Sequence, residues 1–226
     1  MRPATDTSIL RPYGFPRLLV AVLACLFVAA AAAQGSSYED SLSSARLGDT
    51  RQLAALLARG IDPNTVDAQG NSLLMLAARE GHKATVETLL RYRPSLGLRN
   101  LAGDSALMLA VLKGHEDVAD LLLAAGAPVD QDGWTPLHYA AFEGRTALVD
   151  KLLASGARID APAPNQATPL MIAARNGHID VVRRLLAAGA DVDLKNDRGL
   201  TADAWARAQG NTDIAALIEA ARTRRR

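Results

Sequence analysis

The sequence is poor in cysteine, in aromatic residues and in net charge. One cysteine and nine aromatic residues (two Trp, four Tyr and three Phe) occur among 226 residues. Nine aromatic side chains are too few for the core of a large β-sandwich or barrel, and a mean hydropathy of +0.05 is too apolar for a disordered chain. Alanine and leucine, with 44 and 34 residues, make up roughly a third of the chain. We therefore expect a core of small, helix-favouring side chains that pack closely.

The net charge of +1 is unevenly distributed. Three arginines and one aspartate lie in the first 17 residues, and four of the last five residues are arginine. The segment between them carries 18 basic and 23 acidic residues, a net charge of −5. A nucleic-acid partner is not expected for such an acidic body, because nucleic-acid binding begins with neutralisation of phosphates. Residues 222–226 are predicted to form a solvated basic tail, with contact to an anionic surface as the alternative.

The N-terminal region is typical of a secretory signal peptide. Residues 18–33 form an uncharged apolar run that follows Arg11 and Arg17 and ends in small residues before a predicted cleavage at Gln34. The run is also shorter than the roughly 20 residues that span a membrane. We predict a signal peptide over 1–33, a periplasmic location and no stable membrane insertion after cleavage. Secretion, or retention of the run as an inner-membrane anchor facing the periplasm, is the alternative.

Cysteine and lysine usage bear on the compartment and the source. Cys25 lies inside the apolar run, where the preceding residues match a lipid-attachment motif only weakly. After cleavage the chain would hold no thiol, which excludes disulfides, thiol redox chemistry and cysteine metal ligands. Arginine outnumbers lysine by 21 to 4, a bias that we associate with GC-rich coding and a bacterial source.

Glycine recurs at a fixed period along the predicted mature chain. One set has intervals of 33, 33, 30, 33 and 33 residues: Gly48, Gly81, Gly114, Gly144, Gly177 and Gly210. Two further sets keep a constant distance from the first: Gly60, Gly126, Gly156 and Gly189 follow it by 12 residues, and Gly70, Gly103, Gly133 and Gly199 precede it by 11. Such a period is typical of solenoids, whose units are stable only when they stack on neighbours.

The unit over residues 132–160 shows what each position does. Thr135 is expected to cap a first helix that begins at Pro136, where the missing N–H of proline loses no hydrogen bond. Alanines on this helix allow close approach of the next one, and Gly144 ends it in a conformation that favours glycine. A second helix with apolar residues at three- and four-residue spacing then runs to Gly156.

These residues resemble an ankyrin repeat almost letter for letter. The resemblance is carried by residues 132–141 (DGWTPLHYAA) and 152–157 (LLASGA), and again by 168–174 (TPLMIAA) and 185–192 (LLAAGADV). In two earlier units serine, at Ser72 and Ser105, replaces the threonine of the Thr-Pro pair and can still cap the helix.

The resemblance covers residues 38–221 and implies an all-α ankyrin-repeat solenoid of about six helix-turn-helix units with short β-turn fingers. We assign residues 34–221 to this domain, which leaves no room for a second one. The end units are expected to act as caps. The first unit places serines at alanine positions (Ser41, Ser43 and Ser44), and the last has charged residues (Asp203, Arg207 and Glu219) that we expect on a water-facing side.

The histidines and methionines have explanations from their repeat positions. His82, His115 and His178 follow the inter-helix glycine, and equivalent positions in stacked repeats lie about 8 to 10 Å apart. Metal ligands lie within about 2.1 Å of one ion, so we predict no metal, no cofactor and no catalytic site. A column formed by Met75, Met108, Met171 and His138 is predicted to fill the core, with a redox or soft-metal role for its methionines as the alternative.

The resemblance also implies that partners bind the finger tips and the concave face of the first helices. The matching positions are Asn71, Arg79, Asp104, Leu112, Lys113, Trp134, Phe142, Glu143 and Arg175. Because aromatic residues are scarce, we predict Trp134 and Phe142 as the anchors of an apolar centre that includes Leu112, with the charged residues as its rim. The alternative is that Trp134 packs on the neighbouring turn.

One interval of 30 residues marks an irregular finger. Three residues are missing between Val129 and Gly133, which predicts a shorter finger and a notch beside Trp134. In the next finger Pro162 and Pro164 stiffen the loop, and Gln166 stands where the turn glycine would be.

Together these features predict a monomeric, non-catalytic module or scaffold that binds another protein in the periplasm. The alternative is a secreted effector or toxin-neutralising protein that binds a host or competitor target through the same surface.

Overall fold

The computed structural model of the protein describes residues 37–225, nearly all of which belong to one compact unit, Asp40–Arg226. The predicted signal peptide, Cys25 and the cleavage position at Gln34 lie outside the described residues. Residues 37–47 form a first helix, and eleven further helices follow in the described part of the chain.

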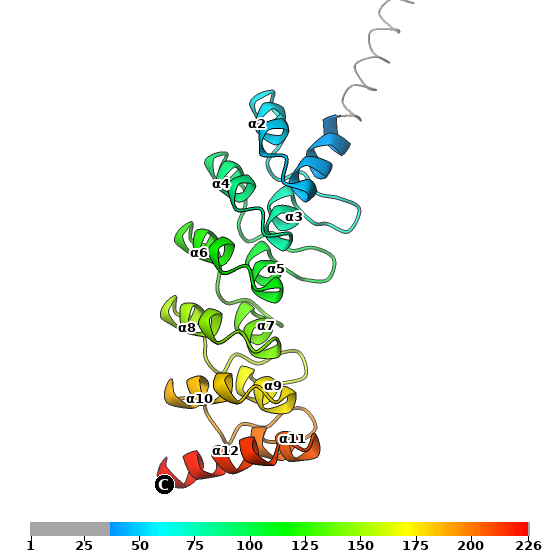
Figure 1. The fold of residues 1–226 in the computed structure, drawn as a ribbon. Coiled ribbons are helices and arrows are strands. Elements are labelled where there is room, and N and C mark those ends of the chain that lie inside the picture. The colour runs from blue at the N-terminus through cyan, green and yellow to red at the C-terminus, as the bar shows by residue number, and fades with distance from the viewer. Residues whose placement is uncertain (1–36, 226) are drawn as a thin grey trace, which may run out of the picture. The chain divides into compact units, whose positions relative to one another are not determined.

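The helices alternate between two stacked columns (Figure 1). The first helix of each pair, called the inner helix here, is residues 37–47, α3 (Leu73–Arg79), α5 (Ala106–Lys113), α7 (Pro136–Phe142), α9 (Pro169–Asn176) or α11 (Ala202–Ala208). The second, outer helix is α2 (Thr50–Ala58), α4 (Lys83–Arg91), α6 (Glu116–Ala124), α8 (Thr146–Ala154), α10 (Ile179–Ala187) or α12 (Thr212–Arg225). From α3 onward, each helix packs on its pair mate and on the equivalent helices of adjacent pairs. The predicted all-α solenoid of about six helix pairs is confirmed.

The inner helices begin as the sequence predicts. The hydroxyl oxygens of Ser72, Ser105, Thr135 and Thr168 each accept a hydrogen bond from a backbone N–H in the first turn, at 3.2 to 3.4 Å. Proline occupies the first turn of α7 and α9. Each inner helix that carries such a cap has at most eight residues, so its stability depends on packing against neighbours.

Short turns connect the helix pairs on one side of the stack. The N–H groups of Gly70, Gly103 and Gly199 each donate to the carbonyl three residues earlier at 2.9 Å, which is the hydrogen bond of a β-turn. Successive turns also bond to one another: the N–H of Leu101 donates to the carbonyl of Gln69 at 3.0 Å. The predicted β-turn fingers are therefore present.

The core is one continuous cluster of alanine and aliphatic side chains that runs through all the repeats. Met75 and Met171 lie within it, and Met75, Met108 and Met171 are each 1% exposed. His138 fills the same position in its own repeat with 0% exposed. The predicted core role of this column is confirmed by its burial.

A hydrogen bond between consecutive repeats explains the inter-helix glycines Gly48, Gly81 and Gly144. The Nε2 atoms of His82, His115 and His178 bond the carbonyl at the end of the preceding inner helix, at 3.0, 3.1 and 2.8 Å. Each ring lies against the glycine of the preceding repeat. A Cβ atom at Gly81 would approach the His115 ring to 2.6 Å, and the φ angle of Gly81 is +76°. Both constraints require glycine.

The first and last repeats close the stack in different ways. Ser41 and Ser44 are buried in the first inner helix, whereas Ser43 is exposed. In the last repeat, the expectation that Asp203 faces water is wrong, because the residue is only 5% exposed. The predicted boundary at residue 221 is also wrong: α12 continues to Arg225 as a helix, and Arg222 takes part in the folded domain.

Arg222 covers Asp203 and explains its burial. The guanidinium donates to the Asp203 carboxylate at 2.7 Å and to the carbonyl of Val192 at 2.9 Å. Arg207 bonds the other carboxylate oxygen at 3.1 Å and also pairs with Glu219. Burial alone would raise the pKa of Asp203, but hydrogen bonds from Arg222, Thr201 and Arg207 lower it to about 2.

Asp203→Asn should lower the free energy of unfolding by about 2 kcal/mol at pH 7, because one pKa unit corresponds to about 1.4 kcal/mol. Since the pKa of Asp203 is lowered in the folded state, its stabilisation is complete above about pH 4 and is lost as the pH falls towards 2. Urea unfolding at neutral and acid pH measures this difference. Asp193→Asn is the control, because its carboxylate also binds Arg222 but is 66% exposed. An equal loss for Asp203→Asn at both pH values would contradict the assignment.

Candidate partner-binding surface

The residues two positions before the first five inter-helix glycines form a row at the C-terminal ends of the inner helices. This row, called the inner column here, comprises Arg46, Arg79, Leu112, Phe142 and Arg175. Because α3, α5, α7 and α9 pack side by side (Figure 1), successive members lie about 8 to 10 Å apart. The two apolar members are therefore neighbours between two arginines. Phe142 is 41% exposed and Leu112 is partly exposed.

The backbone beneath Phe142 is fixed by the next repeat. Its carbonyl accepts hydrogen bonds from Nδ2 of Asn176 at 3.0 Å and from Nε2 of His178 at 2.8 Å. The carbonyl of Arg79 is held by His115 in the same way. These bonds keep Phe142 and Arg79 on a rigid backbone support, which limits the entropy lost when a partner binds.

Charged side chains surround the two apolar residues. Arg79 pairs with Glu80 at 2.8 Å, and Glu143 lies 3.9 Å from Arg145. The guanidinium of Arg175 lies over the Trp205 ring, 5.1 Å from its centre. Lys113 is exposed at the end of α5 and has no ion pair among the described residues. The predicted rim residues Arg79, Lys113, Glu143 and Arg175 thus lie at the same ends of the inner helices as Leu112 and Phe142.

The structure does not bring Trp134 and Phe142 together. Trp134 precedes the cap of α7 and Phe142 is its last residue, so the two lie at opposite ends of a helix about 10 Å long. Trp134 is partly buried against the core, with its ring centre 5.5 Å from that of His138 and 5.9 Å from that of Tyr139. The expectation of one apolar patch anchored by both residues is therefore wrong, and Trp134 packs within its own repeat.

Two predicted contact residues are engaged within the protein. Asn71 is only 7% exposed: its Oδ1 accepts from Nδ2 of Asn100 at 2.8 Å, and its own amide donates to Asp67. It connects two fingers, which is why its side chain is not available on the surface. Asp104 accepts a hydrogen bond of 2.7 Å from the Tyr139 hydroxyl. Burial, and then this bond to Asp104, raise the pKa of Tyr139.

Two residues that the sequence patterns did not single out lie near the fingers. Tyr139 occupies a position where the other three internal repeats carry Leu76, Leu109 or Ile172, and it joins Trp134 in a partly buried aromatic pair. An aromatic residue where the other internal repeats are aliphatic was the available signal. Leu101 lies at a finger tip and is 83% exposed, which makes it a further apolar contact for a partner.

The shortened finger forms the predicted notch, although Trp134 does not line it. A hollow of about 360 Å³ lies between Gly133 and the loop that contains Pro162 and Pro164. The side-chain amide of Gln131 closes the shortened finger with a hydrogen bond, because its Nε2 donates to the carbonyl of Trp134 at 2.7 Å.

The histidines and acids of the described residues do not converge on a metal site. Among residues 37–225, no three histidine, cysteine, aspartate or glutamate side chains are placed to hold one ion. His138 donates from Nε2 to the carbonyl of Ala167 at 3.1 Å, and its Nδ1 accepts from the N–H of Thr135 at 3.2 Å. Burial lowers the pKa of His138, which keeps the ring neutral and structural. No helix in the described part of the chain is long and apolar enough to span a membrane.

The chain is similar to several solved structures. It shares 32% identity with a chain of the solved complex between the predatory endopeptidase Bd0816 of Bdellovibrio bacteriovorus and the immunity protein Bd3460. The match covers 80% of this chain and 96% of that chain, with a TM-score of 0.71. The ankyrin repeat domain of Bcl-3, of the IkappaB family, shares 29% identity over 72% and 75% of the two chains, with a TM-score of 0.65. The human ASB11 ankyrin repeat domain shares 24% over 79% and 96%, with a TM-score of 0.66, and shows the fold alone.

The family comparison agrees with the solved structures. A model described as ankyrin repeats in three copies matches residues 42–131, 85–163 and 148–223. A search of curated protein sequences gave no match. Ankyrin repeats are protein–protein interaction modules, and nothing in the comparisons points to an enzymatic activity. The matches span most of the chain, which therefore belongs to the ankyrin-repeat family.

Proposed function

We propose that the protein binds another protein, without catalysis, through the inner column and the adjoining finger tips. The observation that carries this proposal is the neighbouring apolar pair of exposed Phe142 and partly exposed Leu112, between the cationic Arg79 and Arg175. An apolar centre with a charged rim has the composition of a protein-binding hot spot. The hydrogen bonds from Asn176 and His178 support the backbone of Phe142 in advance of binding.

The charge pattern indicates which kind of partner surface would bind. Arg79, Lys113 and Arg175 bring three cations to the inner face, where Glu80 and Glu143 are the neighbouring acids at the same helix ends. We expect a partner surface with apolar side chains at its centre and mixed charges around them, because such a rim selects partners and steers their approach.

The proposed location is the periplasm of a bacterium, after removal of residues 1–33, and the proposed state is a monomer. The basic, apolar and small-residue regions of that segment support export. Secretion, or retention of the segment as an inner-membrane anchor, would present the same repeats on the far side of the membrane.

A second candidate function is neutralisation of an enzyme or toxin by direct binding. It is favoured by the 32% identity to a chain of a solved complex between an endopeptidase and an immunity protein. A peptidase or toxin captured by the purified chain should lose activity on addition of the chain. Capture without loss of activity would leave the binding function intact and exclude neutralisation.

Replacing Leu112 and Phe142 by alanine together should reduce capture of the partner at least about tenfold, because truncation of a buried anchor costs more than about 1 kcal/mol each. Pull-down from a periplasmic extract of the source organism, followed by mass spectrometry, measures the loss. Tyr92→Ala is the matched control, since Tyr92 is 39% exposed but follows an outer helix. Circular dichroism should stay unchanged in both variants. Undiminished capture by the double variant would overturn the proposed site.

The mature N-terminus should lie near Gln34, because small residues end the apolar run directly before it. Mass spectrometry of the protein from a periplasmic fraction checks this expectation. An intact Met1 on protein found in the cytosol would overturn the proposed location.

A further inference from the structure

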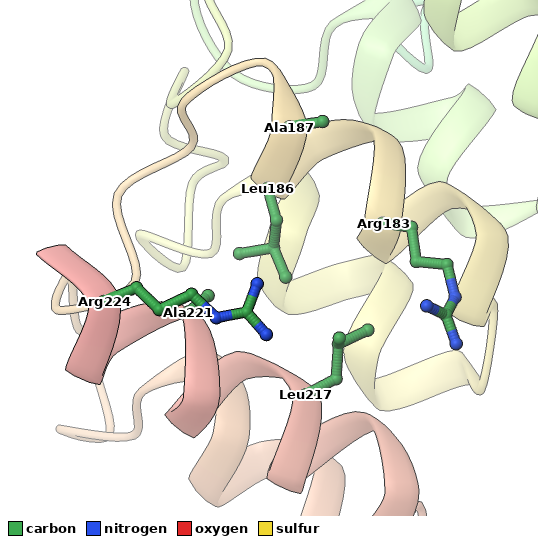
Figure 2. Close-up of a pocket in the computed structure, with 6 residues that line it drawn as sticks. All are labelled: Arg183, Leu186, Ala187, Leu217, Ala221 and Arg224. Carbon is green, nitrogen blue, oxygen red and sulfur yellow. The ribbon is translucent and has the colours of Figure 1, made fainter.

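An open groove lies between the outer helices α10 and α12, near the C-terminal end of the chain. Figure 2 shows the side chains that line it: Arg183, Leu186, Ala187, Leu217, Ala221 and Arg224. The groove has a volume of about 400 Å³. It involves none of the inner-column residues, so it is a separate surface from the one described above.

The two preceding outer grooves are crossed by ion pairs. Between α6 and α8, Nζ of Lys151 lies 2.7 Å from the Asp120 carboxylate. Between α8 and α10, the guanidinium of Arg184 lies 3.4 Å from the Asp150 carboxylate. In both cases the acidic residue belongs to the repeat before that of the basic residue. Lys151 and Arg184 occupy the same position of their outer helices, and so do Asp120 and Asp150.

The sequence reverses this pattern at the last groove. Arg183 stands at the repeat position of Asp120 and Asp150, where an acid would be expected, and Leu217 stands at the position of the bases. No ion pair can form between arginine and leucine. Arg183 and Arg224 are both exposed, and neither has an ion pair among the residues that the structure describes. The groove lining therefore carries two guanidinium groups and no carboxylate.

The floor of the groove is apolar. Leu186 and Leu217 are partly buried and pack against the core, one from each helix. Ala187 and Ala221 add small side chains, which leave room between α10 and α12. The floor between the two arginines is therefore apolar and partly buried.

We propose that this groove is a second docking surface, which binds an acidic segment of a partner protein. The segment would place an aliphatic side chain against Leu186 and Leu217, and carboxylates against Arg183 and Arg224. Charge complementarity carries this choice: guanidinium groups form paired, charge-assisted hydrogen bonds with carboxylates, and the lining offers no competing acid. The proposal does not depend on the function assigned to the inner column.

Fluorescence anisotropy with the full chain tests the groove. The probe is a fluorescein-labelled, end-blocked peptide of sequence Asp-Glu-Leu-Leu-Asp-Glu, with two reference peptides in which serine replaces leucine or lysine replaces the acids. Saturable binding is expected for the first peptide only. Arg183→Glu with Arg224→Glu should weaken it at least about tenfold, through loss of two charge-assisted contacts. Ala221→Trp should also weaken it, because the indole fills the groove without a change of charge.

Matched variants separate this surface from general charge effects and from the inner column. Arg198→Glu changes an exposed arginine in a finger and should leave peptide binding intact, as should Leu112→Ala with Phe142→Ala. Circular dichroism confirms the fold of each variant.

Several results would overturn the proposal. They are no saturable binding of the acidic leucine peptide, equal binding of the serine peptide, binding unaffected by both groove variants, and preferential binding of phosphatidylglycerol vesicles that is lost with Arg183→Glu. A concentration-dependent dimer that dissociates on the same substitution would assign the groove to a second copy of this chain instead, and would also overturn it.

Discussion

The stack depends on one contact between consecutive repeats, in which a side chain at the start of an outer helix bonds the carbonyl at the end of the preceding inner helix. His82, His115 and His178 make this bond, and Asn211 makes it in the last repeat to the carbonyls of Ala174 and Arg175. At Gly48, Gly81 and Gly144 a Cβ atom would approach the histidine ring to 2.6 or 2.7 Å, so these three positions require glycine. These three glycines and the held carbonyls of Arg46, Arg79, Phe142 and Arg175 follow from it.

Much of the fold can be predicted from the sequence, because helix starts, helix ends and repeat length are set by local chemistry. Ser72, Thr135 and the glycine sets are sufficient for the helix boundaries. The domain end could not be predicted, because the burial of Asp203 depends on Arg222, 19 residues later. The hydrogen-bond partners of Asn71 and Asp104 could not be predicted either, since each residue bonds a side chain of the following repeat. Side-chain pairing across repeats depends on rotamers and on helix register, which a single sequence does not encode locally.

Both proposed surfaces lie where the repeat pattern changes. In the inner column, Leu112 and Phe142 stand at positions that are arginine in the flanking repeats. In the outer column, Arg183 stands at a position that is acidic in the two preceding repeats. The framework does not require either change, because the buried alanines, the caps and the glycines are kept around them. Departures from local consistency are where function is expected in a protein whose remaining positions agree with the fold.

Site-specific photocrosslinking tests the central claim most directly, because it reports contact without removing the contacting surface. The photoreactive amino acid p-benzoylphenylalanine is placed at position 112 or, as the control, at position 92, in the protein expressed in its source organism. Irradiation should give a discrete heterodimeric adduct from position 112 and none from position 92. Adducts from position 92 alone, or none from position 112, would contradict binding through the inner column.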